Sequence, residues 1–321
     1  MFSYDSFGIK LLNSQFWLDA HRKVPFSFVS HGHSDHIRNH EKILATKPTI
    51  RFHAMRGKYG EAVALDYGQV YEYEDMRIRL YPAGHILGSA MIWIERDGQS
   101  LLYTGDFKLR QSHTSEQIEI PHADILIMES TYGDPSYTTD NSISNIVEEL
   151  DSTLKQCLQD GSAPIILAYV LGKAQEAMKI LGDLGYAVRV HPVAWKFAQV
   201  YAEFGLSFPN CAPWRGGSLA RGEILIFPPH LTRSRDFHSI RNKKTIFLSG
   251  WANGRNITNY QSDYAIPLSD HADFGELLEF VRKVNPKKVF TTHGFDDFPQ
   301  HIRSIGYDAE LLKPATQYSL F

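Results

Sequence analysis

The chain has 321 residues, of which 43% are hydrophobic and 21% charged, and its formal net charge is -3. This is an ordinary globular composition, long enough for one large domain or two of common size, and it does not indicate a disordered chain. No window approaches the roughly 18 uninterrupted apolar residues of a membrane-spanning helix. Cys157 and Cys211 lack a CxxC spacing, so a thiolate zinc site is not indicated. We expect a soluble, cytoplasmic protein whose function resides in particular sites.

Short β-type runs recur along the chain, and each ends in a polar cluster. In chain order they cover 26–30, 77–84, 100–105, 124–130 and 287–294, and the ligand-type residues at or just after their ends are His31, His85, Asp106, Glu129 and His293. Their β-branched and aromatic content is typical of strands. In layered α/β folds, strand ends on one edge can converge on a common crevice although they are distant in sequence. We therefore expect these side chains to lie close together.

The middle of the chain follows a different pattern, in which strand-like and helix-like runs alternate. Strands are predicted at 163–170, 186–192, 222–229 and 243–251, and helices at 171–185 and 193–205. Such alternation is typical of parallel βαβ units. Because this part has no metal-type loop, we expect 136–262 to form a second α/β module, inserted into a first one made of 1–135 and 263–321.

The sequence HGHSDH at residues 31–36 crowds histidines and an aspartate into one short loop directly after a predicted strand. On an extended segment, alternating residues such as His31 and His33 can reach one zinc ion, and Asp35 and His36 can then serve a second ion. A polar surface turn would explain any single histidine here. The four ligand-type residues together favour a metal site.

One loop cannot complete such a site, so further ligands are expected at other strand ends. His85 in PAGHILGSA is flanked by glycines that permit a close approach of the backbone. Asp106 in LLYTGDF offers a carboxylate that can bridge two ions. Taken alone, His85 is as often an ordinary loop histidine, and Asp106 is more often a turn or cap residue. Their order along the chain favours the metal interpretation.

HGHSDH, then GH at 84–85 and TGDF at 104–107, resemble the signature of the metallo-β-lactamase superfamily. The fold of that superfamily is an αββα sandwich with a dinuclear metal site along one edge. Glu129 in MESTYG, His271 in LSDHAD and His293 in TTHG are similar to three further motifs of the β-CASP nucleases, in which a second α/β domain is inserted into this fold. The resemblance covers nearly the whole chain, including LGKAQEA and LSGW in the middle module.

The family pattern implies two divalent metal ions. Imidazole ligands favour Zn²⁺, and the carboxylate share is also compatible with Mn²⁺. The pattern implies one ion on His31, His33 and His85 and a second on Asp35, His36 and His293, with Asp106 bridging them. Two such ions can polarise a phosphodiester oxygen, generate hydroxide from water and stabilise the leaving oxygen. Asp35 is therefore counted with the catalytic residues as well as with the metal ligands.

His271 precedes a segment in which Asp273 and Glu276 have the spacing of a helix capping box. The family implies that His271 contacts the scissile phosphate or acts as the general acid toward the leaving group. Glu129 is expected to orient His271 or a metal-binding histidine. In isolation, a structural histidine near a helix start and a solvent-facing glutamate would explain these two residues. Weaker candidates for an orienting role are Asp19 and Asp270.

Contacts with a polyanionic substrate would need local basic patches, because the net charge gives no general attraction to nucleic acid. The segment LTRSRDFHSIRNKK at 231–244 supplies Arg233 and Arg235 among other basic residues, although such a run is more often a solvated face. Ser249 and Gly250 can offer a hydroxyl and a backbone N–H to a phosphate, although this dipeptide after a strand is also common in turns.

We expect a metal-dependent nuclease that hydrolyses phosphodiester bonds. A histidine at the position of His293 is typical of RNA-processing members of the family. The short chain and the stretches LAYVLGKAQ, LSGW and SDHADF resemble instead the prokaryotic exonucleases associated with DNA ligase. This resemblance favours a DNA exonuclease of repair, in functional association with a DNA ligase and a helicase. The alternatives are an RNA-processing endo- or exoribonuclease, a small-molecule hydrolase such as a thioesterase or lactamase, and a non-catalytic scaffold that binds nucleic acid.

Overall fold

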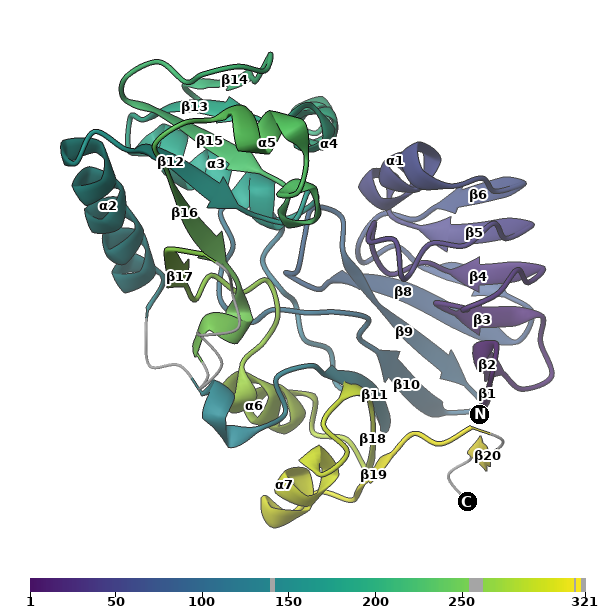
Figure 1. The fold of residues 1–321 in the computed structure, drawn as a ribbon. Helices are drawn as coiled ribbons and strands as arrows, with labels where there is room; N and C mark the ends of the chain where they lie inside the picture. The colour runs from purple at the N-terminus through teal and green to yellow at the C-terminus, as the bar shows by residue number, and fades with distance from the viewer. Residues whose placement is uncertain (139–141, 254–261, 315, 319–321) are drawn as a thin grey trace. The chain divides into compact units, whose positions relative to one another are not determined.

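The computed structural model describes residues 1–138, 142–253, 262–314 and 316–318, and its strands form three sheets (Figure 1). The chain divides into two compact units. The first comprises Met1–Pro135 and His271–Phe321, and the second comprises Ser136–Asp270. The second unit, hereafter the inserted unit, thus interrupts the first, hereafter the metal unit. Within the described ranges, no helix is both long and apolar enough to cross a bilayer.

The metal unit contains two seven-stranded sheets. The first has the order β20-β1-β2-β3-β4-β5-β6 and consists of β1 (Phe2–Asp5), β2 (Gly8–Leu11), β3 (Phe16–Leu18), β4 (Phe26–Phe28), β5 (Lys42–Ala45), β6 (Glu61–Ala64) and β20 (Thr316–Tyr318). The second has the order β19-β18-β11-β10-β9-β8-β7 and consists of β7 (Tyr71–Tyr73), β8 (Met76–Pro82), β9 (Ala90–Arg96), β10 (Gln99–Tyr103), β11 (Ile125–Ser130), β18 (Lys288–Gly294) and β19 (Ala309–Leu311).

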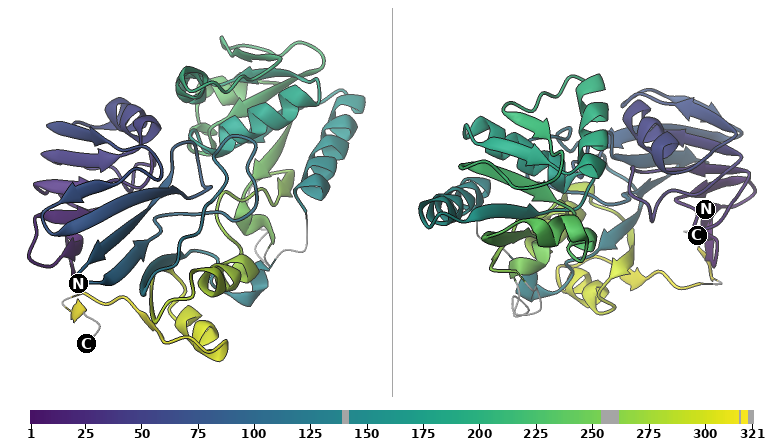
Figure 2. Two further views of the ribbon diagram at one scale, coloured as in Figure 1. Left: turned by 180° about the vertical axis from the view of Figure 1, so that it is seen from behind. Right: turned by 45° about the horizontal axis from the view of Figure 1, so that its top comes forward.

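Apolar side chains join these two sheets face to face and also bind helices to their outer faces. Phe16 and Phe28 of the first sheet pack with Ile78 and Ile127 of the second in one buried cluster. The helices of the metal unit are α1 (Lys47–Arg56), α6 (Phe274–Val284) and α7 (Phe298–Ser304). The apolar face of α6 and α7 covers the second sheet, and α1 lies against the first (Figures 1 and 2). The predicted αββα sandwich is therefore confirmed.

The inserted unit is built on one parallel sheet of order β14-β13-β15-β12-β16-β17. Its strands are β12 (Ala163–Leu167), β13 (Ala187–Val190), β14 (Cys211–Pro213), β15 (Glu223–Phe227), β16 (Lys243–Leu248) and β17 (Tyr264–Ile266). Alternate residues of each strand face opposite sides. One face packs on α2 (Ile143–Gln159), α3 (Lys173–Asp183) and α4 (Pro192–Glu203), and the other on α5 (Arg235–Ser239). The predicted parallel βαβ pattern is confirmed here.

Short 3-10 helices complete the described elements, namely η1 (Pro135–Tyr137), η2 (Pro229–Leu231) and η3 (Gly250–Asn253). The sequence predicted that the chain returns to the first module at about residue 263. In the structure, the boundary between the two units lies between Asp270 and His271. The difference arises because β17 pairs with β16 and so belongs to the inserted sheet.

The start of α6 is the helix boundary that matters most for the site, because His271 lies just before it. Asp273 is the N-cap, and its side chain accepts a hydrogen bond from the backbone N–H of Glu276 at 2.9 Å. The Glu276 carboxylate accepts one from the backbone N–H of Asp273 at 3.0 Å. The predicted capping box is therefore confirmed, and it fixes the backbone that follows His271.

Gly105→Ala is expected to destabilise the fold more than Gly98→Ala. Both glycines have a left-handed backbone, with φ of 55 and 74 degrees, which costs an alanine about 1–2 kcal/mol. A Cβ at Gly105 would also lie 2.5 Å from Cβ of Ser30, whereas a Cβ at Gly98 would meet nothing within 4 Å. We expect a further loss of about 1–3 kcal/mol at Gly105 from overpacking. Urea unfolding midpoints measure both, and equal losses would show that Ser30 yields at no cost.

Candidate metal centre

The predicted ligands lie where they do because several strands of the second sheet run in the same direction. β10 pairs in parallel with β11, and β11 with β18. β8 shares their direction, because two antiparallel pairings through β9 separate it from β10. His85, Asp106, Glu129 and His293 therefore lie at the same edge of this sheet. The HGHSDH loop follows β4 of the facing sheet.

His31, His33, His85 and Asp106 form a group in which each residue offers one ligand atom within 4.8 Å of the others. Nε2 of His31 and Nε2 of His85 each lie 3.1 Å from Nδ1 of His33. Oδ2 of Asp106 lies 3.4 Å from Nε2 of His31 and 3.8 Å from Nε2 of His85. A tetrahedral zinc ion with bonds of about 2.0–2.1 Å holds its ligand atoms about 3.3 Å apart. The donor set and its spacing therefore fit zinc.

Local contacts hold these imidazoles in the ligand orientation. Nδ1 of His31 lies 3.0 Å from Oγ of Ser30, so Nε2 is the nitrogen that faces the group. Burial lowers the pKa of His31 well below its usual range, which keeps the imidazole in the neutral, metal-binding form. His85 follows Gly84, whose φ is 77 degrees and whose absent Cβ would lie 2.4 Å from the carbonyl oxygen of Lys108. Only glycine fits that turn.

The second predicted ligand set is more open. Nε2 of His36 lies 3.6 Å from Oδ2 of Asp106 and 3.9 Å from Oδ2 of Asp35, whose side chain is 76% exposed. His293 is exposed, and its ring centroid is 6.3 Å from that of His36. The structure thus brings His36, Asp35 and Asp106 together and leaves His293 at their margin. Its φ of 50 degrees is unusual for a histidine and coincides with the irregularity in the pairing of β18 with β11.

Asp19 is the carboxylate that orients His36. Nδ1 of His36 lies 2.8 Å from Oδ2 of Asp19, which directs Nε2 toward Asp106. Asp19 also accepts hydrogen bonds from the backbone N–H of Ser30 at 2.8 Å, from Oγ of Ser30 at 2.6 Å and from the hydroxyl of Tyr103 at 2.9 Å. The sequence analysis ranked Asp19 as a weak candidate and missed Ser30 and Tyr103. Ser30 directly precedes the HGHSDH loop, and Tyr103 directly precedes TGDF.

The charges around His36 and Asp106 are strongly coupled. Burial opposes the charged form of His36, but the negative charges of Asp106 and Asp19 outweigh burial and raise its pKa to about 10. Burial, together with the charge of Glu129, raises the pKa of Asp106 to about 7, against the opposing effect of His36. A cation bound by His36 would therefore compete with a proton at this side chain.

His271 and Glu129 form the other pair that the sequence predicted. Nδ1 of His271 lies 2.9 and 3.1 Å from the two carboxylate oxygens of Glu129, which is only 2% exposed. Glu129 also accepts hydrogen bonds from the backbone N–H of Phe107 at 2.9 Å and from the hydroxyl of Thr131. The ring of His271 lies 4.7 Å from that of His85, and Asp106, Glu129 and His271 form a second group with ligand atoms within 4.8 Å. His271 is therefore adjacent to the first ligand group.

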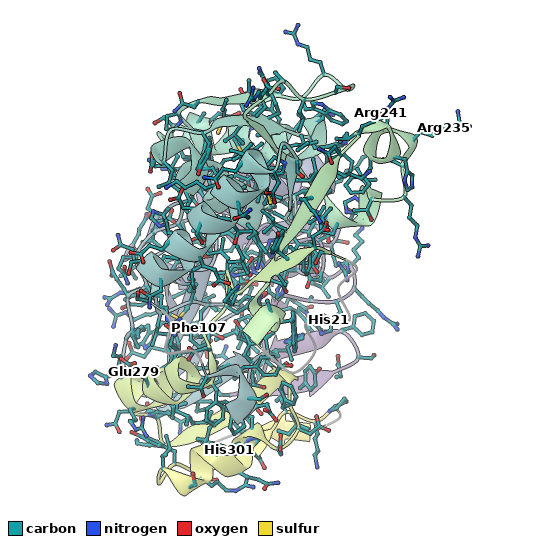
Figure 3. All side chains as sticks on the ribbon, turned by 60° about the vertical axis from the view of Figure 1, so that its left-hand side comes forward. His21, Phe107, Arg235, Arg241, Glu279 and His301 are labelled. Carbon is teal, nitrogen blue, oxygen red and sulfur yellow. The ribbon has the colours of Figure 1, made fainter. Side chains whose placement is uncertain are left out.

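The residues predicted to bind substrate all lie in the inserted unit. Arg233 and Arg235 are exposed, and the side chains of Arg235 and Arg241 reach outward from the region of α5 (Figure 3). Ser249 and Gly250, the other two predicted substrate contacts, are buried. Ser249 follows β16 directly, and its hydroxyl accepts the backbone N–H of Trp251 at 3.2 Å, so it closes the turn.

The sequence is similar to several known proteins. Residues 264–309 match the family described as Zn-dependent metallo-hydrolase RNA specificity domain. A "Probable DNA ligase" of Opitutus terrae is 39% identical over 98% of this chain and 31% of its own length. An "RNase J-like protein" of Methanocaldococcus jannaschii is 31% identical over 50% of this chain and 44% of its own length. The "Endoribonuclease YSH1" of Yarrowia lipolytica is 32% identical over 46% of this chain and 17% of its own length.

These similarities indicate the β-CASP nucleases of the metallo-β-lactamase superfamily, in agreement with the predicted resemblance. The chain spans less than half the length of each of these three relatives. A crystal structure of a protein of unknown function from Enterococcus faecalis superimposes with a TM-score of 0.63 over 91% of this chain and 80% of its own, at 14% identity. That similarity bears on the fold alone.

Zinc binding to the metal-free protein is expected to release protons. Because the pKa of His36 is raised to about 10, this side chain is protonated at pH 7 and must lose its Nε2 proton to bind a cation. The affinity of the ion that uses His36 should therefore rise about tenfold per pH unit from 7 toward 10. Calorimetric zinc titrations in buffers of different ionisation enthalpy count the protons released. Asp19→Asn removes one of the two negative charges and should reduce that count, whereas a heat independent of buffer would contradict the prediction.

Proposed function

We propose that this β-CASP chain hydrolyses phosphodiester bonds of nucleic acid with two divalent metal ions, zinc in the first place and manganese as the alternative. The observation that carries the proposal is the position of His271 beside the histidine and aspartate group, with Nδ1 held by Glu129. Nε2 of His271 is the atom that we propose to act on a substrate. A zinc site that served structure alone would have no need of such a pair.

The residues would divide the reaction as follows. Bound metal ions would supply Lewis-acid stabilisation of the phosphate and a hydroxide nucleophile at neutral pH. His31, His33, His85 and Asp106 would hold the first ion, and Asp35, His36 and His293 with Asp106 the second. As the bond from phosphorus to the attacking oxygen forms and the bond to the leaving oxygen breaks, Nε2 of His271 gives its proton to the leaving oxygen. Asp35, which is exposed on the same loop, is the proposed acceptor for the proton of the attacking water.

DNA is the proposed substrate, and the proposed action is exonucleolytic. The support is the relative named as a probable DNA ligase, which resembles 98% of this chain at 39% identity. The same similarity supports a functional association with a DNA ligase, whereas the association with a helicase rests on the family resemblance alone. A repair role of this kind places the proposed activity in the cytoplasm.

RNA is the second candidate substrate, and specific observations favour it. The family matched by residues 264–309 is described by RNA specificity, and the relatives from Methanocaldococcus jannaschii and Yarrowia lipolytica are named as ribonucleases. These RNase-type matches cover about half of this chain or less, whereas the DNA-ligase-type match covers nearly all of it. Coverage is the reason that DNA ranks first.

Arg233 and Arg235 are the proposed contacts with substrate phosphates. Both are exposed, and among the described residues neither has an acidic partner within 4.0 Å, so their charge is available to a polyanion. Lys244 in the same segment is paired with Asp263 at 2.9 Å and is a poorer candidate. The cluster would offset locally the net charge of -3.

His271→Ala is expected to retain bound metal and to lose cleavage. His271 is hydrogen-bonded to Glu129 and is outside the group of His31, His33, His85 and Asp106. Loss of a general acid lowers kcat by about 10²–10⁴-fold. His33→Ala is the matched variant and should lose both metal and cleavage. Metal content by mass spectrometry and cleavage of an end-labelled oligonucleotide measure the two effects. Wild-type cleavage by His271→Ala would remove this residue from the mechanism.

The substrate class is decided by single-stranded DNA and RNA of the same sequence, each labelled at one end. Each is incubated with the protein and Zn²⁺ or Mn²⁺, and with a chelator as control. Stepwise, metal-dependent shortening of DNA alone is the expected result and also gives the direction of digestion. Internal cuts in RNA would transfer the protein to the RNA-processing branch. Binding without cleavage of either, with metal present, would indicate the scaffold.

A further inference from the structure

Lys173 is a buried cation that the proposed mechanism does not use. It is the first residue of α3, and its side chain is 3% exposed. The amino end of a helix carries a partial positive charge, so a cation is unfavourable there. Burial adds a desolvation cost. A lysine in this place needs strong compensation from its surroundings.

The compensation comes from the segment that leads to His271. Nζ of Lys173 donates to Oδ1 of Asp270 at 2.8 Å and to the carbonyl oxygen of Leu268 at 3.1 Å. Asp270 is itself buried, with a side chain 10% exposed. The backbone N–H of Leu268 donates to the carbonyl of Ile266 at the end of β17, at 2.9 Å. Lys173 is therefore hydrogen-bonded to the last residues of the inserted unit, directly before His271 in the chain.

The start of α3 is constructed so that Lys173 stays in this position. Gly172 is the N-cap and has a φ of 86 degrees, and its N–H donates to Oε1 of Gln175 at 2.8 Å. The amide of Gln175, which is fully buried, donates to the carbonyl oxygens of Val170 and Ala194, each at 3.1 Å. Because the N–H of Gly172 and the side-chain amide of Gln175 are both hydrogen-bonded, the first turn of α3 is fixed, and so is the backbone of Lys173.

The residues after Asp270 are anchored separately in the metal unit. Nδ1 of His271 is held by Glu129, and the backbone N–H of Ala272 donates to the carbonyl of Phe107 at 2.8 Å. Arg110 then pairs with both members of the capping box of α6, Asp273 and Glu276. His271 therefore directly follows a residue that Lys173 holds within the inserted unit and directly precedes residues that are held within the metal unit.

We propose that Lys173 is a positioning residue for His271 and acts through Asp270. The inference rests on the proposed nuclease function, in which His271 protonates the leaving oxygen. Replacing a buried ion pair by apolar groups often leaves stability unchanged, so stability is a weak reason for the pair to exist. A displacement of a catalytic group by about 1 Å costs on the order of 10²-fold in rate, so fixing one backbone segment is a sufficient reason.

The test compares Lys173→Met with the double variant Lys173→Met/Asp270→Asn. The single variant leaves a buried carboxylate without its partner and is prone to misfold, whereas the double variant removes both charges. Lys179→Met is the matched control, because Lys179 lies on the same helix and pairs with Asp183 at 2.6 Å on the surface. His271→Ala serves as the reference for loss of the general acid. Metal content is measured for every variant.

Comparing kcat on two substrates distinguishes a displaced general acid from a damaged metal centre. An oligonucleotide has a poor leaving oxygen that needs a proton, whereas the p-nitrophenyl ester of thymidine 5′-phosphate does not. We expect the double variant to lose on the order of 10²-fold in kcat on the oligonucleotide, with KM and metal content unchanged. On the activated ester it should lose less than about threefold, as His271→Ala should.

Hydrogen exchange of the metal-free protein provides a readout that does not depend on activity. Amides of residues 268–274 should exchange faster in the double variant and at the wild-type rate in Lys179→Met. Wild-type cleavage with unchanged exchange would overturn the inference, and so would an equal loss on both substrates with metal lost. If the wild-type protein cleaves neither substrate, the proposed function fails instead, and the exchange data alone decide whether Lys173 holds this segment.

Discussion

The buried carboxylate of Asp19 is the constraint on which the arrangement of the metal unit's ligand loop depends. It is 4% exposed and accepts hydrogen bonds from both the N–H and the hydroxyl of Ser30, from Tyr103 and from His36. An ionised carboxylate away from water is tolerable only with such compensation. Its donors come from the loop after β4 and from β10, which belong to different sheets. One charge therefore fixes the ligand loop against the facing sheet edge.

Glu129 is a second buried carboxylate that orients a histidine, in this case His271. Both carboxylates hold Nδ1 of an imidazole, that of His36 in one case and that of His271 in the other. His36 lies 3.6 Å from the shared carboxylate of Asp106 and is therefore suited to a cation. His271 lies beside the ring of His85 instead, where a proton donor would meet a phosphate held by that cation. The same kind of pairing would thus serve the proposed metal ligand in one place and the proposed acid in the other.

The parallel insert and the capping box follow from local periodicity and residue spacing, whereas the sandwich was predicted from the resemblance of the motifs to a known family. The sequence also predicted that His31, His85 and Asp106 lie close together, because each follows the end of a predicted strand. It could not rank Asp19, whose importance appears only when its donors from separate strands are brought together. It left open whether Ser249 contacts a phosphate or closes a turn, because a serine–glycine pair after a strand is compatible with both; in the structure its hydroxyl accepts the backbone N–H of Trp251.

The side chains of the two proposed ligand sets differ in burial. His31, His36 and His85 are buried, whereas the side chain of Asp35 is 76% exposed and His293 is exposed. An ion held by His31, His33, His85 and Asp106 would therefore be bound by side chains that are mostly shielded from water. An ion at the open set would keep water ligands and face the solvent from which a substrate arrives. Asp106 touches both sets, so its single negative charge would couple a fixed ion to an accessible one.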